Sequence, residues 1–317
     1  MKMKRGLGLL AAGIALTLST GAMAVDKIHF LVPGGAGGGW DGTARGTGEA
    51  LTKSGLLQSA SYENRSGGGG GKAIAWLIKN AKRSQGTMMV NSTPIILRSL
   101  RGTFPQSWRD LTPIAGIIGD YGAFVVKADS EFETFEQAAQ SFLENPINVR
   151  IAGGSVVGSM DHLVAAQALQ AYGGKPYNLR YVAYDAGGKA MAGLLSGETQ
   201  MLSTGLGEAL DQARAGNVRI LCATSTEEVA GVPPCGKDIE FVNWRGFFGA
   251  PGLDAATADS YAKLLGDMQK TPEWETVRKR NGWVNIYRPR DQFVTFLEQQ
   301  ENEMRALFKE LGIKTVR

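Results

Sequence analysis

A short apolar run over residues 29–32 leads directly into a loop with almost no side chains, Pro33-Gly-Gly-Ala-Gly-Gly-Gly-Trp-Asp41. Successive glycines can adopt positive φ and let the main chain approach a partner closely, and the amide groups at the start of a following helix form a concave site for an anion. Asp41 is a suitable N-cap for a helix that continues to Lys53, whose positive end would point at the loop. The loop therefore predicts a site for a small carboxylate.

Two phosphate-binding motifs are alternatives for the glycine-rich segments. Residues 37–42 fit G-x-G-x-x-G after a strand, with Glu63 about 20 residues further on, as a dinucleotide site requires. Trp40 stands where the pyrophosphate would pass, which counts against a nucleotide. Residues 66–73 resemble a P-loop, but Ala73 replaces the Ser or Thr that must reach Mg²⁺. Flexible turns are the remaining alternative, although they do not explain why the glycines follow strand-like runs.

The first 24 residues have the features of a secretory signal. Basic residues within positions 2–5 precede an apolar core over 6–18, and Ala22-Met-Ala24 is an A-x-A cleavage site. The apolar core is shorter than the roughly 20 residues of a membrane span, and no later run of the sequence approaches that length. We therefore expect an exported, soluble, periplasmic protein whose mature chain begins near Val25.

Charge does not indicate a nucleic-acid or membrane partner. The chain has 34 Lys and Arg against 30 Asp and Glu, but three of the basic residues lie in the signal, so the mature chain is close to neutral. The basic residues form no clustered stripe of the kind that follows a phosphate backbone.

Cys222 and Cys235 are the two cysteines of the sequence. In an oxidising compartment they permit one disulfide. Cys222 also lies in a strand-like run, 219–223, where a lone buried cysteine is common. Both alternatives stay open, because sequence alone cannot fix the pairing.

Strand-like and helical segments alternate along the mature chain, which predicts parallel βαβ units. About 290 residues exceed what one core usually serves, so we expect two lobes. No Pro-rich or Ser-rich linker separates them, so the chain should cross between lobes more than once, after Gly122 and within 240–251. The predicted strands are 28–32, 60–63, 87–90, 111–118, 122–126, 148–152, 180–183, 199–203 and 218–223. The predicted helices are 43–53, 72–81, 135–143, 159–172, 188–195, 208–215, 255–269, 272–281 and 289–311.

Three later junctions repeat the strand, small-residue loop and helix of the opening. Residues 151–162 place Ser155 and Ser159 before a helix, where hydroxyl and backbone donors suit a carboxylate. The junctions 184–188 and 203–208 follow the same pattern. Four such junctions are more than chance turns would give, so the later ones predict a second wall of the site.

None of the loops at 37–41, 92–93 and 155–159 contains Lys or Arg. We therefore expect a ligand carboxylate to be held chiefly by backbone N–H groups, hydroxyls and helix N-termini. Helix capping is the alternative for each junction and the preferred role for Asp41 and Asp185. The predicted ligand-binding residues are Gly37, Gly38, Gly39, Trp40, Asp41, Ser92, Thr93, Ser155, Gly158, Ser159, His162, Tyr184, Asp185, Gly187 and Gly205.

A secreted enzyme is the alternative function. Only His29 and His162 could serve a Ser–His type of catalysis, and neither neighbours a G-x-S-x-G elbow. No Cys/His spacing in the sequence suggests a metal site. We expect no catalytic residue, metal or cofactor, and we expect His162 to fix the 155–159 loop.

Eight motifs resemble, in order, those of the periplasmic solute receptors of the tripartite tricarboxylate transporters, and the resemblance extends from about Lys27 to Leu311. The motifs are Pro33-Gly-Gly-Ala-Gly-Gly-Gly-Trp-Asp41, Glu63-Asn-Arg-Ser-Gly-Gly68, Leu111-Thr-Pro-Ile114, Gly154-Ser-Val-Val-Gly-Ser-Met-Asp-His-Leu163, Tyr181-Val-Ala-Tyr-Asp-Ala-Gly-Gly188, Leu194-Leu-Ser-Gly197, Ala215-Gly-Asn-Val-Arg219 and Asn243-Trp-Arg-Gly246.

This resemblance implies an α/β, two-lobed type II periplasmic binding protein fold, with parallel or mixed sheets, flanking helices and a ligand cleft between the lobes. Residues 25–124 and 244–317 would form the first lobe, and 125–243 the second. The resemblance also implies a small carboxylate ligand and delivery to a membrane permease of one large and one small subunit, driven by an ion gradient. We expect the receptor to be a monomer.

Two positions bear on the ligand. Trp40, where many relatives have Ser, resembles the citrate-type branch of the family. Asp185-Ala186 departs from the Ser-Gly, Lys-Gly or Arg-Gly of relatives, and its carboxylate would either repel a tricarboxylate or cap a helix.

Overall fold

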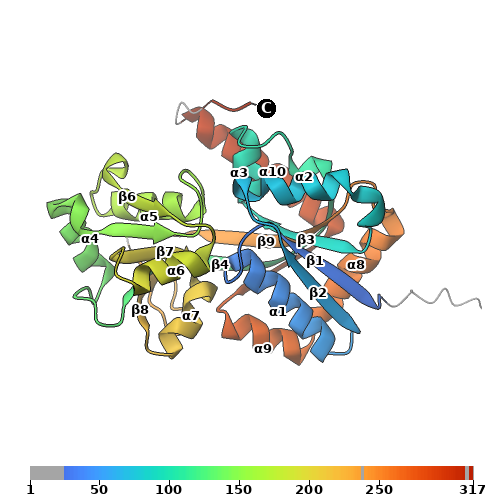
Figure 1. Ribbon diagram of the computed structural model, residues 1–317, viewed down its shortest axis with the longest axis horizontal. Helices are drawn as coiled ribbons and strands as arrows, with labels where there is room; N and C mark the ends of the chain where they lie inside the picture. Colours follow the sequence, from blue (N-terminus) through green and yellow to red (C-terminus); the bar gives the residue numbers. More distant parts are fainter. Residues whose placement is uncertain (1–24, 237–238, 311–313, 317) are drawn as a thin grey trace, which may run out of the picture.

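Two lobes connected by a pair of long strands make up the protein (Figure 1). The computed structural model describes residues 25–236, 239–310 and 314–316, so the predicted signal over 1–24 lies outside the described residues. The first lobe contains β1 (Lys27–Val32), α1 (Gly39–Lys53), β2 (Ser59–Asn64), α2 (Gly71–Lys79), β3 (Thr87–Ser92), α3 (Pro94–Leu100), α8 (Ala255–Met268), α9 (Pro272–Arg280), β10 (Val284–Pro289) and α10 (Arg290–Glu310). The second lobe contains α4 (Phe135–Glu144), β5 (Arg150–Gly153), α5 (Met160–Ala171), β6 (Arg180–Ala183), α6 (Gly187–Leu195), β7 (Met201–Gly205), α7 (Leu206–Arg214) and β8 (Val218–Ala223). The connecting strands are β4 (Thr112–Lys127) and β9 (Val242–Gly249).

The strands follow the order β2-β1-β3-β9-β4-β7-β5-β6, with β8 and β10 also paired to β4. In the first lobe β1 pairs in parallel with β2 and β3, and in the second β5 pairs in parallel with β6 and β7. The connecting strands are antiparallel to their neighbours. The predicted α/β class is therefore confirmed, with parallel units in each lobe and mixed sheets overall.

The strand β4 changes sheets at Gly122. It pairs with β9 as far as Tyr121 and with β7 from Gly122 onward. The sequence predicted two separate runs here, 111–118 and 122–126, whereas the structure forms one strand of 16 residues. The pairing continues through both runs because β9 accompanies the first and β7 and β8 the second. The expected lobe boundaries, 124/125 and 243/244, fall within β4 and β9.

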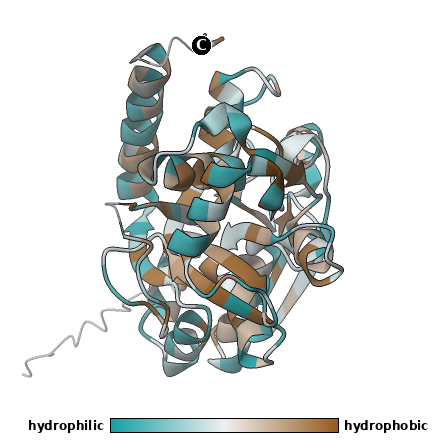
Figure 2. Cartoon of the chain, turned by 90° about the vertical axis from the view of Figure 1, so that its left-hand side faces the viewer, coloured by the Kyte–Doolittle hydropathy of each residue, from teal (hydrophilic) through white to brown (hydrophobic). Residues whose placement is uncertain are grey.

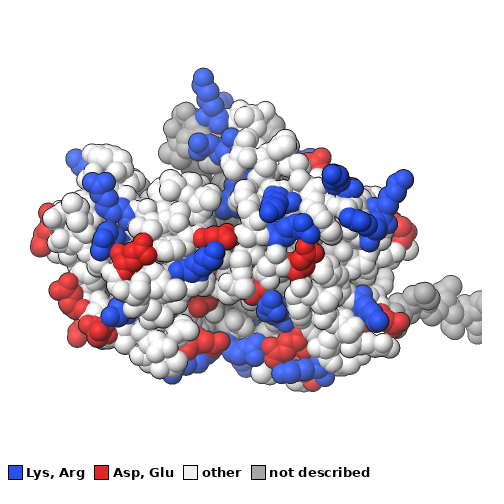
Figure 3. All heavy atoms as spheres, in the orientation of Figure 1, with Lys and Arg blue, Asp and Glu red and all other residues white. Residues whose placement is uncertain are grey.

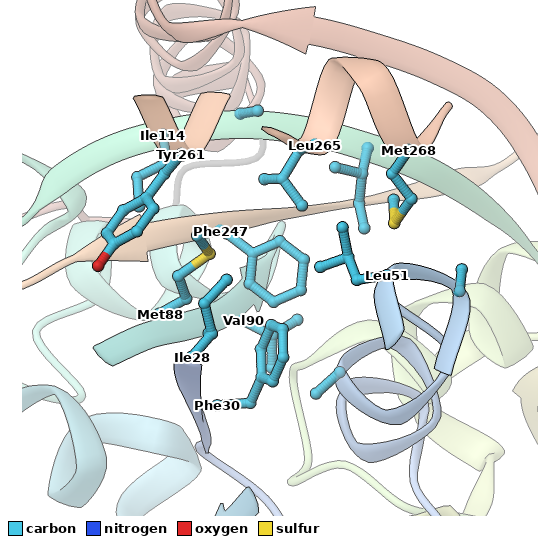
Figure 4. Close-up of a cluster of buried hydrophobic side chains, with 14 of the residues drawn as sticks. Ile28, Phe30, Leu51, Met88, Val90, Ile114, Phe247, Tyr261, Leu265 and Met268 are labelled. Atoms are coloured by element: carbon cyan, nitrogen blue, oxygen red, sulfur yellow. The ribbon is translucent and has the colours of Figure 1, made fainter. Parts of the chain in front are cut away.

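The first lobe is organised around an aromatic and aliphatic core between its sheet and helices (Figure 4). Phe30 of β1 lies 5.4 Å, between ring centroids, from Phe247 of β9, and both side chains are fully buried. Leu51 of α1 and Leu265 of α8 close the same cluster from the helices. Burial of each such side chain contributes about 1.5–3 kcal/mol, so this core fixes the sheet whose strands lead into the glycine loop.

The second lobe has its own core and the disulfide. Phe124 of β4 packs against Phe135 of α4, with ring centroids 4.3 Å apart. Cys222 and Cys235 are joined by a disulfide, so of the two alternatives left open by the sequence the disulfide is the one that forms. Figure 2, which views this lobe from outside, shows hydrophobic strands at the centre and hydrophilic segments on the outer helices.

Three elements were not predicted from the sequence: β9, whose segment was predicted only as a crossing between the lobes, and two shorter ones. The sequence pattern predicted no helix over α3, which follows β3 almost at once, and no strand over β10, which pairs with β4 between α9 and α10. Within the described residues, no helix combines the length and apolar character needed to cross a bilayer.

Two glycines of α1 make a matched test of its packing. A Cβ at residue 48 would lie 2.0 Å from Tyr62 Oη and 3.0 Å from Ala60 Cβ, whereas a Cβ at residue 42 would meet nothing within 4 Å. Gly48→Ala should therefore destabilise the protein by about 1–3 kcal/mol through overpacking against β2. Gly42→Ala should stabilise it by up to about 1 kcal/mol, the difference in helix propensity. Urea unfolding of both variants measures this, and equal effects would contradict the packing of α1 on β2.

Candidate functional site

Segments that follow β1, β3 and β5 and precede α6 line a cavity of about 90 Å³ between the lobes, here called the inner cavity. This volume can hold several groups of the size of a water molecule, and it therefore suits a small ligand. Its walls are Gly35, Gly38, Gly39, Trp40, Ser92, Pro94, Arg98, Gly154, Ser155, Met160, Asp161, Ala186, Gly187, Glu208, Asn243 and Arg245.

An outer cavity of about 270 Å³ adjoins the inner one. Both cavities share Trp40, Arg98, Gly154 and Ser155, and the outer one is bounded further by the second glycine segment, 67–70. Ligands bind at the carboxyl ends of strands in open α/β sheets, and both cavities lie at such ends.

Asp41 stabilises the first glycine loop by a hydrogen bond and does not cap α1. The N-cap is Gly38, and Asp41 is buried within the first turn, so the predicted capping role is wrong. Its Oδ2 accepts a hydrogen bond from the Gly37 amide at 3.0 Å, and its Oδ1 accepts from Asn64 Nδ2 at 3.0 Å and from Arg45 Nε at 2.9 Å. Gly38 lines the inner cavity, whereas Gly37 and Asp41 lie outside its walls.

Trp40 and Ser92 line the inner cavity as a hydrogen-bonded pair. The indole Nε1 donates to Ser92 Oγ at 2.9 Å, while Thr93 is buried outside the walls. Gly39 completes this wall at the start of α1. A Cβ at that position would lie 2.0 Å from Arg245 Nη2, so glycine is what lets the guanidinium reach the helix start.

Arg98 of α3 supplies a cation that sequence reasoning missed. Figure 3 shows basic and acidic side chains interspersed on the surface of one face. Arg98 differs from these, because it is only 6% exposed and lines both cavities. Its Nη2 donates to Ser159 Oγ at 2.9 Å, and its Nη1 donates to the Gly69 carbonyl. Its Nε is buried with no hydrogen-bond partner in the described chain, and no carboxylate there forms an ion pair with it.

Burial lowers the pKa of Arg98 to about 10. The side chain therefore stays charged at neutral pH. Asp161 interacts favourably with this charge but forms no ion pair with it within the described residues. The helix that carries Arg98 is too short to show a clear periodicity, so no local pattern indicated this residue.

Arg245 of β9 is the second missed cation, and it is paired. Its Nη2 lies 2.7 Å from Asp120 Oδ2 and 3.8 Å from Glu208 Oε1, and its Nη1 donates to Thr43 Oγ1 at 3.1 Å. The expectation that a ligand carboxylate is held chiefly by backbone N–H groups, hydroxyls and helix N-termini therefore stays a prediction, to which this cavity adds two arginines from outside the predicted loops. The motif Asn243–Gly246 was noted in the sequence, but no role was assigned to its arginine.

The loop before α5 contributes Ser155, and the first turn of α5 contributes the carboxylate of Asp161. Ser155 Oγ accepts from the Asp161 amide at 3.1 Å and lies 3.4 Å from Tyr181 Oη. Burial raises the pKa of Asp161 to about 6, although hydrogen bonds from Ser155 and Gly154 lower it. Ser159 is buried outside the walls and serves Arg98 instead.

His162 and Gly158 support this loop without lining either cavity. The Gly158 amide donates to His162 Nδ1 at 3.3 Å, and the imidazole packs edge-on against Tyr181 at 5.0 Å between centroids. Gly205 lines a third cavity of about 40 Å³, on the other side of Glu208.

Tyr184 and Asp185 line the outer cavity. Asp185 accepts a hydrogen bond from Ser66 Oγ across the cleft and lies 3.6 Å from Lys189 Nζ. The capping role preferred for Asp185 is wrong, because the N-cap of α6 is Ala186 and receives no side-chain cap. Asp185 instead links the two lobes at the rim.

The first glycine loop and the start of α6 touch across the cleft. A Cβ at Gly35 would lie 3.0 Å from Ala186 Cβ, and one at Gly38 would lie 3.1 Å from it. Ala186 has φ 83°, a conformation that favours glycine, and Gly187 beside it lines the inner cavity. Larger side chains in either loop would hold the lobes apart, so the small residues permit this closed arrangement.

Buried acids in the cavity should make the stability of the ligand-free protein fall as pH rises. Burial raises the pKa of Glu208 to about 8 and that of Asp161 to about 6, so the folded state binds more protons than the unfolded state between about pH 4.5 and 8. The protonated forms of these two acids stabilise the folded state fully below the pKa of the unfolded chain. This stabilisation is lost as pH rises through the pKa of the folded state.

Thermal unfolding between pH 5 and 9 measures this effect. The melting temperature should fall from pH 5 to about pH 8, and Glu208→Gln should flatten the decline most clearly between about pH 6 and 8, where Asp161 no longer contributes to it. Asp211→Asn, an exposed change on the same helix α7, should leave it unchanged. A melting temperature that rises steadily from pH 5 to 9 would contradict the raised pKa values.

Comparison with known proteins places this geometry in a family. The family model described as "Tripartite tricarboxylate transporter family receptor" matches residues 44–313. A protein of the UPF0065 group from Bordetella bronchiseptica is 23% identical over 320 residues, which cover 96% of this chain and 93% of the relative.

Two solved structures are similar in fold. The periplasmic binding protein BugD has a TM-score of 0.79 at 19% identity, covering 91% of this chain and 98% of its own. MatC from Rhodopseudomonas palustris with bound malate has a TM-score of 0.74 at 18% identity, covering 90% and 98%. The two-lobed binding-protein fold is thus shared, and the family consists of solute receptors rather than enzymes. This chain belongs to the tripartite tricarboxylate transporter family of receptors.

Proposed function

We propose that this receptor captures a small di- or tricarboxylate of the citrate type in the inner cavity and delivers it to a tripartite tricarboxylate transporter permease. The observation that carries the proposal is Arg98, a buried guanidinium that lines the cavity and forms no ion pair within the described chain. Desolvating a cation without a partner costs several kcal/mol. An anionic ligand would offset this cost by supplying the missing charge.

Hydrogen-bond donors around Arg98 suit a carboxylate. The Nε–H has no partner in the described chain, and a carboxylate that reached it would accept a charge-assisted hydrogen bond, which is roughly twice as strong as a neutral one. Gly38 and Gly39 place the amide end of α1 in the same walls, where the helix dipole favours negative charge. The malate in MatC, a relative in the same fold, is a ligand of this chemical class.

The remaining parts of the proposal follow from the sequence. The signal over 1–24 would export the chain to the periplasm, where it would act as a monomer, and the permease would have one large and one small subunit. Trp40 in the cavity wall favours the citrate-type branch.

A nucleotide at residues 37–42 or a secreted hydrolase fits less well. Trp40 fills the position where a pyrophosphate would pass and is fixed there by its bond to Ser92. His162, the candidate general base of the second lobe, is bound to its own loop outside both cavities.

Replacing the buried cation gives the direct test of this site. Arg98→Met should weaken binding of citrate or malate by at least tenfold, corresponding to about 1.5–3 kcal/mol for a hydrogen bond to a charged group. Arg45→Met is the matched control, because Arg45 is half exposed, pairs with Asp41 and lies outside the cavity walls. Its effect should stay within about threefold.

Isothermal titration calorimetry of the mature protein at low and high salt measures both affinities. The affinity should depend only weakly on salt concentration, because ions in solution screen a buried pair of Arg98 and ligand carboxylate poorly. If Arg45→Met abolishes binding while Arg98→Met retains it, the carboxylate lies at the lobe surface and the assigned cavity is wrong. If neither citrate, malate nor any other di- or tricarboxylate binds, the proposed function fails.

A further inference from the structure

The inner cavity carries acids as well as the cations expected for an anion site. Arg98 and Arg245 contribute two positive charges, and Asp161 and Glu208 in the walls, with Asp120 behind Arg245, contribute three negative ones when all are ionised. The fully ionised site is therefore negative before any ligand enters. Like charges repel strongly where water is excluded, so an entering carboxylate requires that one of these acids be neutral.

Glu208 is the one of these three acids that receives the fewest hydrogen bonds from the described chain. Asp120 lies 2.7 Å from Arg245 Nη2 and accepts from the Gly207 amide at 3.2 Å, and donors of the loop before α5 hold Asp161. Glu208 approaches Arg245 only to 3.8 Å, which exceeds hydrogen-bond length, and accepts a backbone hydrogen bond from Gly205. Its side chain is 15% exposed, compared with 0% for Asp120, and it lines the inner cavity.

The carboxyl group of Glu208 fits between two glycines that leave space for it. Its Oε2 lies 1.8 Å from the position that a Cβ of residue 187 would occupy, and its Oε1 lies 2.9 Å from that of residue 39. Both neighbours are glycines at helix starts, one in each lobe. The carboxyl group is therefore held between the lobes at the wall of the ligand cavity.

Charged groups face Glu208 from three other elements: Arg245 from β9, Asp120 from β4 and Asp161 from α5. Burial raises the pKa of Glu208 to about 8. The charge of Arg245 and a hydrogen bond from the Gly205 amide oppose this rise, whereas Asp161 and Asp120 add to it. The neutral acid is then the main form at neutral pH.

We propose that Glu208 binds the ligand as a neutral carboxylic acid that donates a hydrogen bond to a ligand carboxylate oxygen, so that each ligand is captured with one proton on this residue. The inference rests on the proposed function and adds a specificity-determining residue to it. Solvent supplies the proton whenever Glu208 is ionised, and the proton remains on Glu208 while the ligand is bound.

Proton uptake on binding tests this directly. Calorimetric titration of the mature protein with citrate and with malate, in buffers of different ionisation enthalpy, gives the number of protons taken up between pH 7 and 9. Arg98, with a pKa of about 10, stays mainly charged in this range. Uptake should rise from near zero at pH 7 toward one proton at pH 9, and affinity should fall up to about tenfold per pH unit above pH 8.

Glu208→Gln distinguishes whether Glu208 donates a hydrogen bond to the ligand or accepts one from it. The glutamine amide still donates a hydrogen bond, but it cannot be ionised. The variant should match the wild type within about threefold at pH 7, remain equally tight at pH 9 and take up no proton. Asp211→Asn on the exposed face of α7 should behave as the wild type.

Two results would overturn the proposal. The first is tight, pH-independent binding by the wild type without proton uptake. The second is a loss of tenfold or more in Glu208→Gln at pH 7, which would mean that Glu208 accepts a hydrogen bond as an anion. Absence of binding by every protein at every pH would instead reject the carboxylate function on which this inference rests.

Discussion

A guanidinium buried between two lobes without a carboxylate partner is the constraint on which this site depends. Arg98 is kept there by a carbonyl of the second glycine segment and by the hydroxyl of Ser159 in the opposite lobe. Neither partner carries a charge, so the desolvation of Arg98 is only partly offset. The short helix α3 must nevertheless place it at this point, and the cavity around it is the space in which an anion would complete the arrangement.

The lobes can approach one another this closely because the facing loops lack side chains. The first glycine loop lies against Ala186, and Glu208 lies between glycines from both lobes. The strand β4 pairs in the sheets of both lobes, and β9 pairs with its first half, so these two strands connect the lobes. Small residues at the rim and these connecting strands together define a cavity that admits only a small molecule.

The sequence predicted the alternating elements and the strand-to-helix junctions because hydrophobic periodicity and glycine clusters are local signals. Trp40, Ser92 and Ser155 of these junctions do line the cavity. Asp41 was misassigned because a first-turn aspartate and an N-cap look alike in sequence, and only the fold shows that its carboxylate holds Gly37 and Asn64.

The charged residues of the site could not be predicted in the same way. Arg98 lies on a helix too short for a periodic signal, and Arg245 lies within a strand that reads as apolar. Glu208 ends the predicted junction 203–208, but no local pattern assigned a role to its carboxyl group. What brings these residues together is the pairing of β9 with β4 and the packing of one lobe on the other, which are contacts between segments far apart in the sequence.

The measurement that tests the carboxylate site most directly is a crystal structure of the mature protein with bound citrate or malate. We expect ligand carboxylate oxygens within hydrogen-bond distance of Arg98 Nε, with the ligand between the first glycine loop and the start of α6. A carboxylate bound elsewhere on the protein, with Arg98 Nε still unpartnered, would contradict the assignment of this cavity as the ligand site.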